Sequence, residues 1–213
     1  RIRVFERNRA DDTFGWGVVF SEETLSHFGD ADRESYDAIR GAFAYWDDIE
    51  THYGGTCVTS TGHGFCGMSR KQLLLILQER CRELGVKMVF QKEIKSLDQV
   101  AGADLVLATN GINSWVREQY KDSFRPSYDW RPNKFVWLGT TKPLPSFTFD
   151  FRQNRHGIWN LHAYQYDASM STWIVETTGE AWDKAGLKDA TEADTVAYCT
   201  ELYRDLLDGH EIV

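Results

Sequence analysis

The chain has few cysteines and prolines, no excess of basic residues and no long apolar run. Its four cysteines form no CxxC pair, which argues against a disulfide scaffold or a common zinc-finger pattern. Lysine and arginine number 24 against 32 acidic residues, and the formal net charge of −8 disfavours binding to nucleic acid or to an anionic membrane. No stretch of about eighteen apolar residues predicts a transmembrane helix. We therefore expect a cytoplasmic protein with reduced thiols.

The sequence also shows no Ser/His/Asp or paired-carboxylate constellation. Cys57, His63 and Cys66 are close in sequence, but their spacing matches no zinc motif and no fourth ligand is evident, so we expect no metal. Aromatic residues, in contrast, are plentiful, with 8 Trp, 9 Tyr and 12 Phe. Such a chain can bury a substantial core in one or two domains and can sandwich a planar ligand.

Two segments have the pattern of parallel strands that end at a nucleotide-binding edge. Residues 103–108 are apolar apart from Asp104 and have the character of a buried strand, and Asn110-Gly111 can make a tight turn before a helix capped by Asn113 or Ser114. Near the start, a short apolar strand ends on Glu6, where a carboxylate often binds the ribose hydroxyls of a dinucleotide. Both patterns also occur in ordinary α/β proteins without a nucleotide.

Residues 69–84 predict a helix between these two strands, because apolar residues repeat there at helical spacing. Ser69 and Gln72 make a capping box, and Gly85 ends the helix. Residues 86–90 then predict a further strand. Before the helix, residues 56–61 and 64–68 predict two strands that pair with each other, with His63 at the bend.

After about residue 130 the pattern changes to strands in series, which predicts an antiparallel meander. The expected strands are residues 134–141, 147–153, 156–166 and 171–176. Period-two alternation puts His162 and Tyr164 on the face richer in hydrogen-bonding groups, so we nominate both, with Trp137 on a neighbouring strand, as substrate contacts. Two helices follow, and the second carries Ala193, Val196, Ala197 and Leu202 on its expected apolar side.

Several strings resemble the flavin-dependent aromatic hydroxylases related to p-hydroxybenzoate hydroxylase. They are VFERN (4–8), FGWGVVFS (14–21), SRKQLL (69–74), ADLVLATNGINS (103–114) and RPNKFVWLGT (131–140). Together with HAYQYDASMSTWIVET (162–177), they are most similar to the subgroup of salicylyl-CoA 5-hydroxylase, 2-aminobenzoyl-CoA monooxygenase and the violacein-pathway monooxygenase. The resemblance covers almost the whole chain.

The resemblance implies an α/β (α+β) fold with a partial FAD-binding, Rossmann-like three-layer domain and an antiparallel substrate-binding sheet. The implied boundaries are 1–130 for the FAD domain, with an inserted strand pair near 56–68, 131–190 for the sheet, and 191–213 for a helix leading back toward the FAD domain. The family's GxGxxG turn before Glu6 and its GD segment after the substrate domain are absent from the sequence. We therefore expect an internal piece of a longer enzyme.

The resemblance also implies roles for individual residues. Glu6, followed by Arg7, matches the ribose-binding acid of the FAD site, and Arg70 matches an arginine that lies against the flavin. Trp16 and Gly17 match a loop near the isoalloxazine ring. Asn110 and Gly111 match a DG pair associated with FAD and the nicotinamide pyrophosphate, although asparagine removes the charge of the usual aspartate.

The implied reaction is hydroxylation of an electron-rich aromatic ring by a flavin hydroperoxide, formed from FAD, molecular oxygen and NADH or NADPH. An aryl-CoA thioester such as salicylyl-CoA is the favoured substrate, and His162 is a candidate general base for a phenol proton. Three alternatives stay open: an indolic natural product as substrate, an NAD-dependent dehydrogenase, and a degenerate, non-catalytic fragment. A dehydrogenase would continue its parallel sheet past Thr140. The sequence gives no indication of the oligomeric state.

Overall fold

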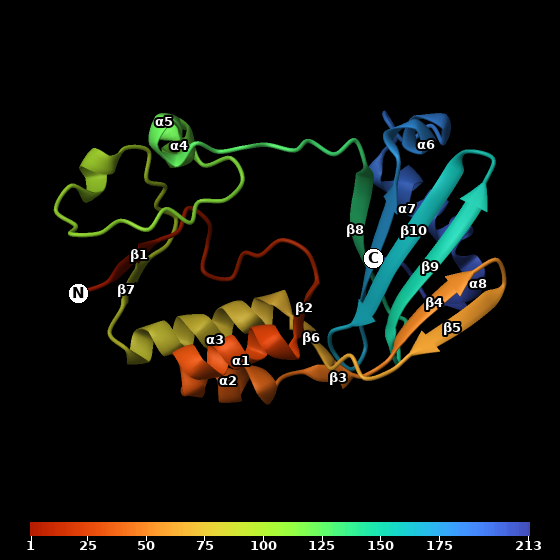
Figure 1. The fold of residues 1–213 in the computed structure, drawn as a ribbon, viewed down its shortest axis with the longest axis horizontal. Helices are drawn as coiled ribbons and strands as arrows, with labels where there is room; N and C mark the ends of the chain where they lie inside the picture. The colour runs from red at the N-terminus through yellow and green to blue at the C-terminus, as the bar shows by residue number, and fades with distance from the viewer.

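The computed structural model describes residues 1–213 as two lobes that are connected at two places (Figure 1). One lobe holds a short parallel strand pair and several helices, and the other holds a six-stranded sheet. A layer of helices and short strands joins the lobes along the bottom of the view, and an extended segment joins them along the top. None of the helices has both the length and the apolar character needed to cross a bilayer.

The first lobe contains the expected parallel strands at its centre. β1 (Arg3–Phe5) pairs with β7 (Lys87–Val89), and Val4 lies opposite Met88. The helix expected between them is present as α3 (Arg70–Glu83), but the Ser69 side chain makes no capping hydrogen bond, so the predicted capping box is not formed. The other helices are α1 (Glu22–Ala31), α2 (Arg33–Arg40), the 3-10 helix η1 (Leu97–Val100), α4 (Trp115–Gln119) and α5 (Lys121–Phe124).

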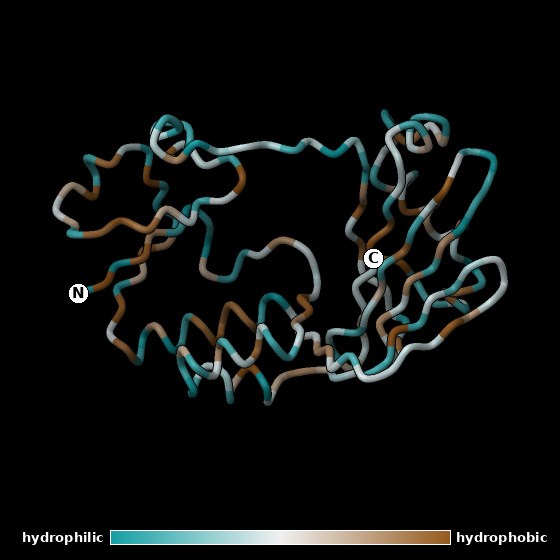
Figure 2. The backbone as a smooth tube through the Cα atoms, viewed as in Figure 1, coloured by the Kyte–Doolittle hydropathy of each residue, from teal (hydrophilic) through white to brown (hydrophobic).

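The prediction of a strand at residues 103–108 is wrong. This segment pairs with no other strand, and Leu105 and Leu107 are 76% and 78% exposed. Figure 2 shows that much of this segment, between η1 and α4, is hydrophobic. The parallel sheet of this lobe has only two strands, and residues 103–108 add no third strand to it. The apolar pattern is therefore present without the strand that it predicts.

A three-stranded sheet lies at the junction of the lobes. It has the order β2–β6–β3, with β2 at Gly17–Ser21, β6 at Phe65–Ser69 and β3 at Ala44–Trp46. Both pairings in this sheet are antiparallel, and Gly17 lies opposite Ser69. β6 leads directly into α3, so this sheet fixes the start of that helix.

The second lobe is built on a six-stranded sheet of order β5–β4–β9–β10–β11–β8. Four of its strands match the expected ones: β8 (Lys134–Thr140), β9 (Phe147–Asn154), β10 (Gly157–Gln165) and β11 (Ser171–Thr177). β9, β10 and β11 form an antiparallel meander, but β8 pairs with β11 and not with β9. After β8, at one edge of the sheet, the chain crosses the end of the sheet before β9 begins. The predicted order of the four strands, a simple meander, is therefore wrong.

The predicted pairing of residues 56–61 with 64–68 is also wrong. β5 (Thr56–Ser60) pairs with β4 (Ile49–Tyr53) through a turn at Gly54-Gly55, where both glycines have positive φ angles, and β4 runs parallel to β9. The hairpin therefore extends the sheet of the second lobe. Residues 65–69 join the junction sheet instead, because β2 and β3 flank them.

The main hydrophobic core lies between one face of the six-stranded sheet and three helices. These are α6 (Gly179–Lys184), α7 (Glu192–Leu202) and α8 (Arg204–Leu207). Trp159, Leu161 and Trp173 are fully buried there against Tyr203, as the predicted alternation requires. The predicted apolar side of the last helix is wrong in part, because α7 buries Thr195 and Cys199 and leaves Ala193 and Ala197 exposed. This helix packs on the sheet of its own lobe.

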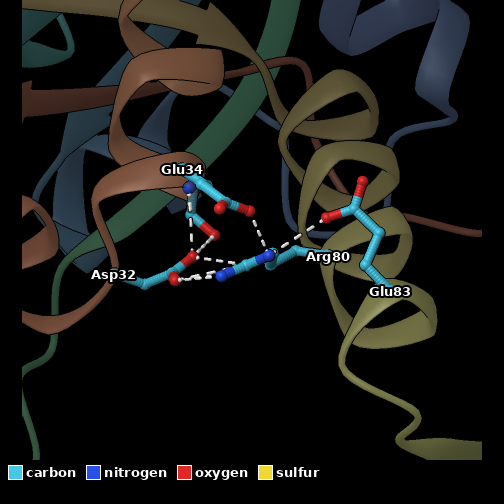
Figure 3. Close-up of polar contacts among 5 residues, drawn as sticks. Asp32, Glu34, Arg80 and Glu83 are labelled. Carbon is cyan, nitrogen blue, oxygen red and sulfur yellow. Dashed lines mark hydrogen bonds and ion pairs between the residues drawn. The ribbon is translucent and has the colours of Figure 1, made fainter.

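An ion-pair network holds α3 against the segment between α1 and α2 (Figure 3). The Arg80 guanidinium donates from Nη2 to Asp32 Oδ1 at 2.7 Å and from Nε to Asp32 Oδ2 at 2.9 Å, and it also contacts Glu34 and Glu83. Asp32 in turn caps α2 by accepting from the Ser35 backbone N–H. Hydrogen bonds from Arg80 hold the pKa of the Asp32 carboxyl well below its usual range.

We expect Arg80→Ala to lower the stability of the protein at neutral pH and to weaken its sensitivity to acid. The folded-state pKa of Asp32 is depressed, so its contribution is present above its unfolded pKa of about 3.9 and is lost as the pH falls below that value. Urea denaturation at neutral and acidic pH measures both effects. Arg82→Ala is the control, because Arg82 makes its contacts within α3 itself. Equal losses in both variants would contradict this role of Arg80.

Candidate functional site

The first residue of β2 is held tightly against the sheet of the second lobe. The Gly17 backbone N–H donates to Thr172 Oγ1 at 3.1 Å, and the Tyr164 hydroxyl donates to the Gly17 carbonyl at 3.3 Å. A Cβ atom at Gly17 would lie 2.7 Å from atoms of Tyr166 and Thr172, so only glycine permits this approach. The close contact fixes the preceding Trp16 beside the sheet, where its ring lies against Gly139.

Arg70 and Trp137 meet at the same place. The Arg70 backbone N–H donates to the Trp16 carbonyl at 3.1 Å, and its guanidinium carbon lies 4.9 Å from the centre of the Trp137 ring. The Arg70 Nε and the Trp137 Nε1 are both buried, and neither has a hydrogen-bond partner. Buried donors without partners are rare in folded proteins, so this pair suits a ligand that supplies acceptor atoms. Gly15 packs directly over the Trp137 ring.

His162 lies on the same face of the sheet as Trp137. His162 is opposite Ile174, and Ile174 is opposite Trp137, so the three residues form one row across β10, β11 and β8. Trp137 was predicted on a strand next to that of His162. Its strand β8 is two strands away from β10 instead, because β11 lies between them. The His162 ring packs edge-on to Phe149 with centroids 5.0 Å apart. Its Nε2 lies 2.7 Å from Asn160 Nδ2.

The surroundings of His162 favour the neutral imidazole. Burial lowers the pKa of His162, and the Glu176 carboxylate, 3.9 Å from Nε2, opposes that shift. Glu176 also accepts a hydrogen bond from Asn133 Nδ2 at 2.8 Å. A neutral imidazole can accept a proton near neutral pH, which a candidate general base requires.

Tyr164 is in this group, but its hydroxyl is already used. The side chain is 5% exposed, stacks on Trp46 and Phe147, and donates to the Gly17 carbonyl. Burial raises the pKa of Tyr164, so its hydroxyl stays protonated and able to donate. Its place in the structure suits anchoring of the Trp16–Gly17 segment.

The remaining predicted residues lie in the first lobe. Glu6 follows β1, is half-buried, and accepts the Asn8 backbone N–H at 2.8 Å, whereas Arg7 is exposed. Asn110 accepts a hydrogen bond from the Ser114 hydroxyl, which caps α4. Gly111 has a φ of +85°, as the tight turn requires. No hydrogen bond joins these residues to the group around Arg70, so the predicted site residues form two separate sets.

The sequence interpretation missed several residues of the sheet face. Phe147, Phe149 and Phe151 are spaced by two along β9 and stack beside His162 and Tyr164. This period-two spacing is visible in the sequence and could have identified them. Asn160 lies on the His162 face as the alternation along this strand predicts, whereas Glu176 contacts His162 and gave no signal in the sequence.

No protein-family model matches the chain. Salicyloyl-CoA 5-hydroxylase from a Streptomyces species is 40% identical to it over 100% of this chain and 43% of that protein. Protodeoxyviolaceinate monooxygenase from Chromobacterium violaceum is 30% identical over 100% of this chain and 57% of that protein. The chain is a homologue of these monooxygenases. It spans about half the length of these relatives.

Solved structures of monooxygenases share the fold. The tetrameric form of 2-methyl-3-hydroxypyridine-5-carboxylic acid oxygenase matches with a TM-score of 0.74 at 17% identity, over 95% of this chain and 57% of that one. PqsL from Pseudomonas aeruginosa, described as a probable FAD-dependent monooxygenase, matches with a TM-score of 0.63 at 14% identity, over 94% of this chain and 59% of that one. The resemblance and the α/β fold class stated from the sequence are therefore confirmed.

The chain's residues fit an FAD cofactor, the group that the description of PqsL names. The unpartnered Arg70 Nε and Trp137 Nε1 offer two buried donors beside a glycine-containing loop. Glu6 has one carboxylate oxygen bonded to Asn8, and no hydrogen bond uses the other. A planar, acceptor-rich ring system and a ribose diol are the groups that such donors and such a carboxylate bind.

Proposed function

We propose that this protein is a flavin-dependent monooxygenase that hydroxylates an electron-rich aromatic ring, with FAD as cofactor and NADH or NADPH as co-substrate. The observation that carries this proposal is the pair of buried, unpartnered nitrogens of Arg70 and Trp137, next to the sheet face that holds His162. Homology to two monooxygenases supports it independently.

In this proposal Glu6 binds the ribose of FAD, with Arg7 beside it, while Asn110 and Gly111 bind near the pyrophosphate. Trp16, Gly17 and Arg70 hold the flavin ring system. The bound cofactor supplies the activation of molecular oxygen that side chains cannot provide.

The sheet face positions the aromatic substrate. Trp137 and Phe149 lie on either side of His162 in the same row across the sheet, and both offer ring faces or edges to a planar substrate. His162 removes the proton from a ring hydroxyl as the ring is attacked, and this raises the electron density of the ring. The largely apolar row excludes water from the reacting atoms.

For the substrate itself we propose an aryl-CoA thioester such as salicylyl-CoA. The support is the higher identity to salicyloyl-CoA 5-hydroxylase, 40% against 30% for the violaceinate enzyme. An indolic substrate is the second candidate. A ligand of the PqsL structure, 2-aminobenzoylacetate, shows that a neighbour of this fold binds a substituted benzoyl compound. An NAD-dependent dehydrogenase is disfavoured, because the sheet after β8 is antiparallel.

The first test is a visible absorption spectrum of the full-length protein. A bound-flavin spectrum, followed by faster NAD(P)H oxidation with salicylyl-CoA than with free salicylate or indole, is the expected result. Faster oxidation with indole would support the second candidate. A folded, colourless protein that cannot be reconstituted with FAD would exclude a monooxygenase and leave the degenerate alternative.

Arg70→Ala is expected to weaken FAD binding by roughly ten- to a hundredfold, because one charge-assisted hydrogen bond is worth about 1.5–3 kcal/mol. Arg70 makes no ion pair, so the fold should survive, as circular dichroism can verify. Lys71→Ala is the control, since Lys71 is the exposed next residue of α3. Titration of the apoprotein with FAD, followed by flavin fluorescence, gives the affinities. Unchanged affinity in Arg70→Ala would exclude Arg70 from the flavin site.

A further inference from the structure

Three metal-ligating side chains meet on the β4–β5 hairpin, away from the candidate active site. Glu50 and His52 are two residues apart on β4 and therefore share a face, and Cys57 on β5 is directly opposite His52. His52 Nε2 lies 3.2 Å from Glu50 Oε2 and 3.6 Å from Cys57 Sγ. The three donor atoms all lie within 4.8 Å of one another.

This arrangement does not suit a proton relay. In a Cys–His–carboxylate relay the two ring nitrogens have different partners, one facing the nucleophile and the other facing the carboxylate. Here the thiol and the carboxylate both lie next to Nε2 of His52. One nitrogen cannot accept a proton from Cys57 while it donates one to Glu50. Three donor atoms that lie within 4.8 Å of one another instead match the first coordination sphere of a cation.

The N···O and N···S separations agree with tetrahedral coordination by zinc. Bond lengths of about 2.0–2.1 Å to nitrogen, 2.0–2.2 Å to oxygen and 2.3 Å to sulfur give N···O and N···S edges of roughly 3.3 and 3.6 Å. The observed 3.2 and 3.6 Å match these edges. The carboxylate and thiolate charges would balance a divalent cation, and a mixed N, O and S donor set suits zinc better than calcium or magnesium.

The cluster faces away from His162. His52 lies opposite Asp150, and Asp150 lies opposite Leu161, which is on the helix-covered face of the sheet. His162 is the next residue along β10, so it points to the other face. The side chains of His52 and Glu50 are 30% and 31% exposed and Cys57 is exposed, so solvent can reach the fourth position.

We propose that Glu50, His52 and Cys57 form a zinc site with a water molecule as the fourth ligand. The site differs from the Cys57, His63 and Cys66 combination considered from the sequence. In the structure His63 Nε2 is bonded to the Ser60 hydroxyl, and Cys66 is buried in β6. Bound zinc connects β4 to β5 across the edge of the sheet, so its role is to stabilise the hairpin, independently of the proposed hydroxylase activity.

The test is titration of the reduced, full-length protein with Zn²⁺ and with Co²⁺, whose thiolate charge-transfer absorption reports a Co–S bond. We expect one ion per chain, a charge-transfer band, and an affinity at least about tenfold lower in Cys57→Ser and in His52→Ala. Cys81→Ser and His63→Gln are matched controls that should bind as the unaltered protein does.

Two results would overturn the site. One is the absence of binding by the unaltered protein at micromolar metal, and the other is a charge-transfer band that persists in Cys57→Ser. Cys57 is exposed, so its replacement by serine is not expected to disturb folding, and an unchanged flavin content or circular dichroism spectrum verifies this. Loss of the band in Cys81→Ser would assign the metal to another thiol and would also contradict the proposal.

Discussion

His162→Gln is expected to lower kcat for a hydroxylated aromatic substrate by about 10²- to 10⁴-fold, the usual contribution of a general base. Glutamine keeps a hydrogen-bonding group next to Asn160 but cannot accept a proton at neutral pH. The substrate-binding face should otherwise be unchanged, so KM should change much less than kcat. Stopped-flow and steady-state measurements of product formation separate the two constants.

The pH dependence of the reaction provides a sharper test of the same residue. Burial lowers the pKa of His162 below its usual value of about 6.5, so the imidazole is neutral and active above that pKa. Activity should therefore fall only as the pH drops below about 6.5, and this acidic limb should disappear in His162→Gln. His63→Gln is the control, since His63 is exposed on the loop before β6. A variant that keeps both its rate and its acidic limb would exclude His162 as the base.

Trp159→Ala should destabilise the protein by about 3–5 kcal/mol, which is typical for removal of a fully buried tryptophan. Trp159 is 0% exposed, packs on Tyr198, and lies in the core between the six-stranded sheet and its helices. Its removal leaves a cavity that the flanking strands cannot fill without losing their register. The loss should appear as a lower urea midpoint in the full-length protein.

Trp130→Ala is the matched control, because it deletes the same side chain from a site that is 84% exposed. Its expected effect is within about 0.5 kcal/mol. Similar midpoints for the two variants would mean that the sheet and its helices do not form the main core. A large loss in Trp130→Ala alone would mean that the extended segment between the lobes contributes more to stability than its exposure indicates.

Much of the fold could be predicted from periodicity. The helix at residues 69–84 and the strands after residue 133 have regular apolar spacing, and α3 and β8 to β11 lie where that spacing places them. β4 was missed because IETHY is short and polar and because its pairing with β9 depends on residues far along the chain. The strand predicted at residues 103–108 failed for the opposite reason, since its apolar pattern is strong but no neighbouring strand pairs with it.

The site was predictable only in part, and the reason is again non-local contact. Trp16, Gly17 and Arg70 came from matched strings and Trp137 from the expected sheet, but nothing in the sequence shows that Arg70 packs on Trp137. That contact depends on how β2 and β6 dock against β10 and β11. The hydrogen bonds of Gly17 to Thr172 and Tyr164 make this docking possible. Local patterns carry no information on such an approach.

The parallel pairing of β4 with β9 has a consequence for the order in which the protein can fold during synthesis. Ile49 pairs with Phe147, about one hundred residues later, and the β4–β5 hairpin has no sheet to join until β9 has left the ribosome. During that interval its unpaired strand edge is open to association with other chains. Contacts of such long sequence separation also slow folding. The six-stranded sheet is therefore built from two separate parts of the chain. A cut between residues 60 and 134 would separate its β4–β5 edge from its other four strands.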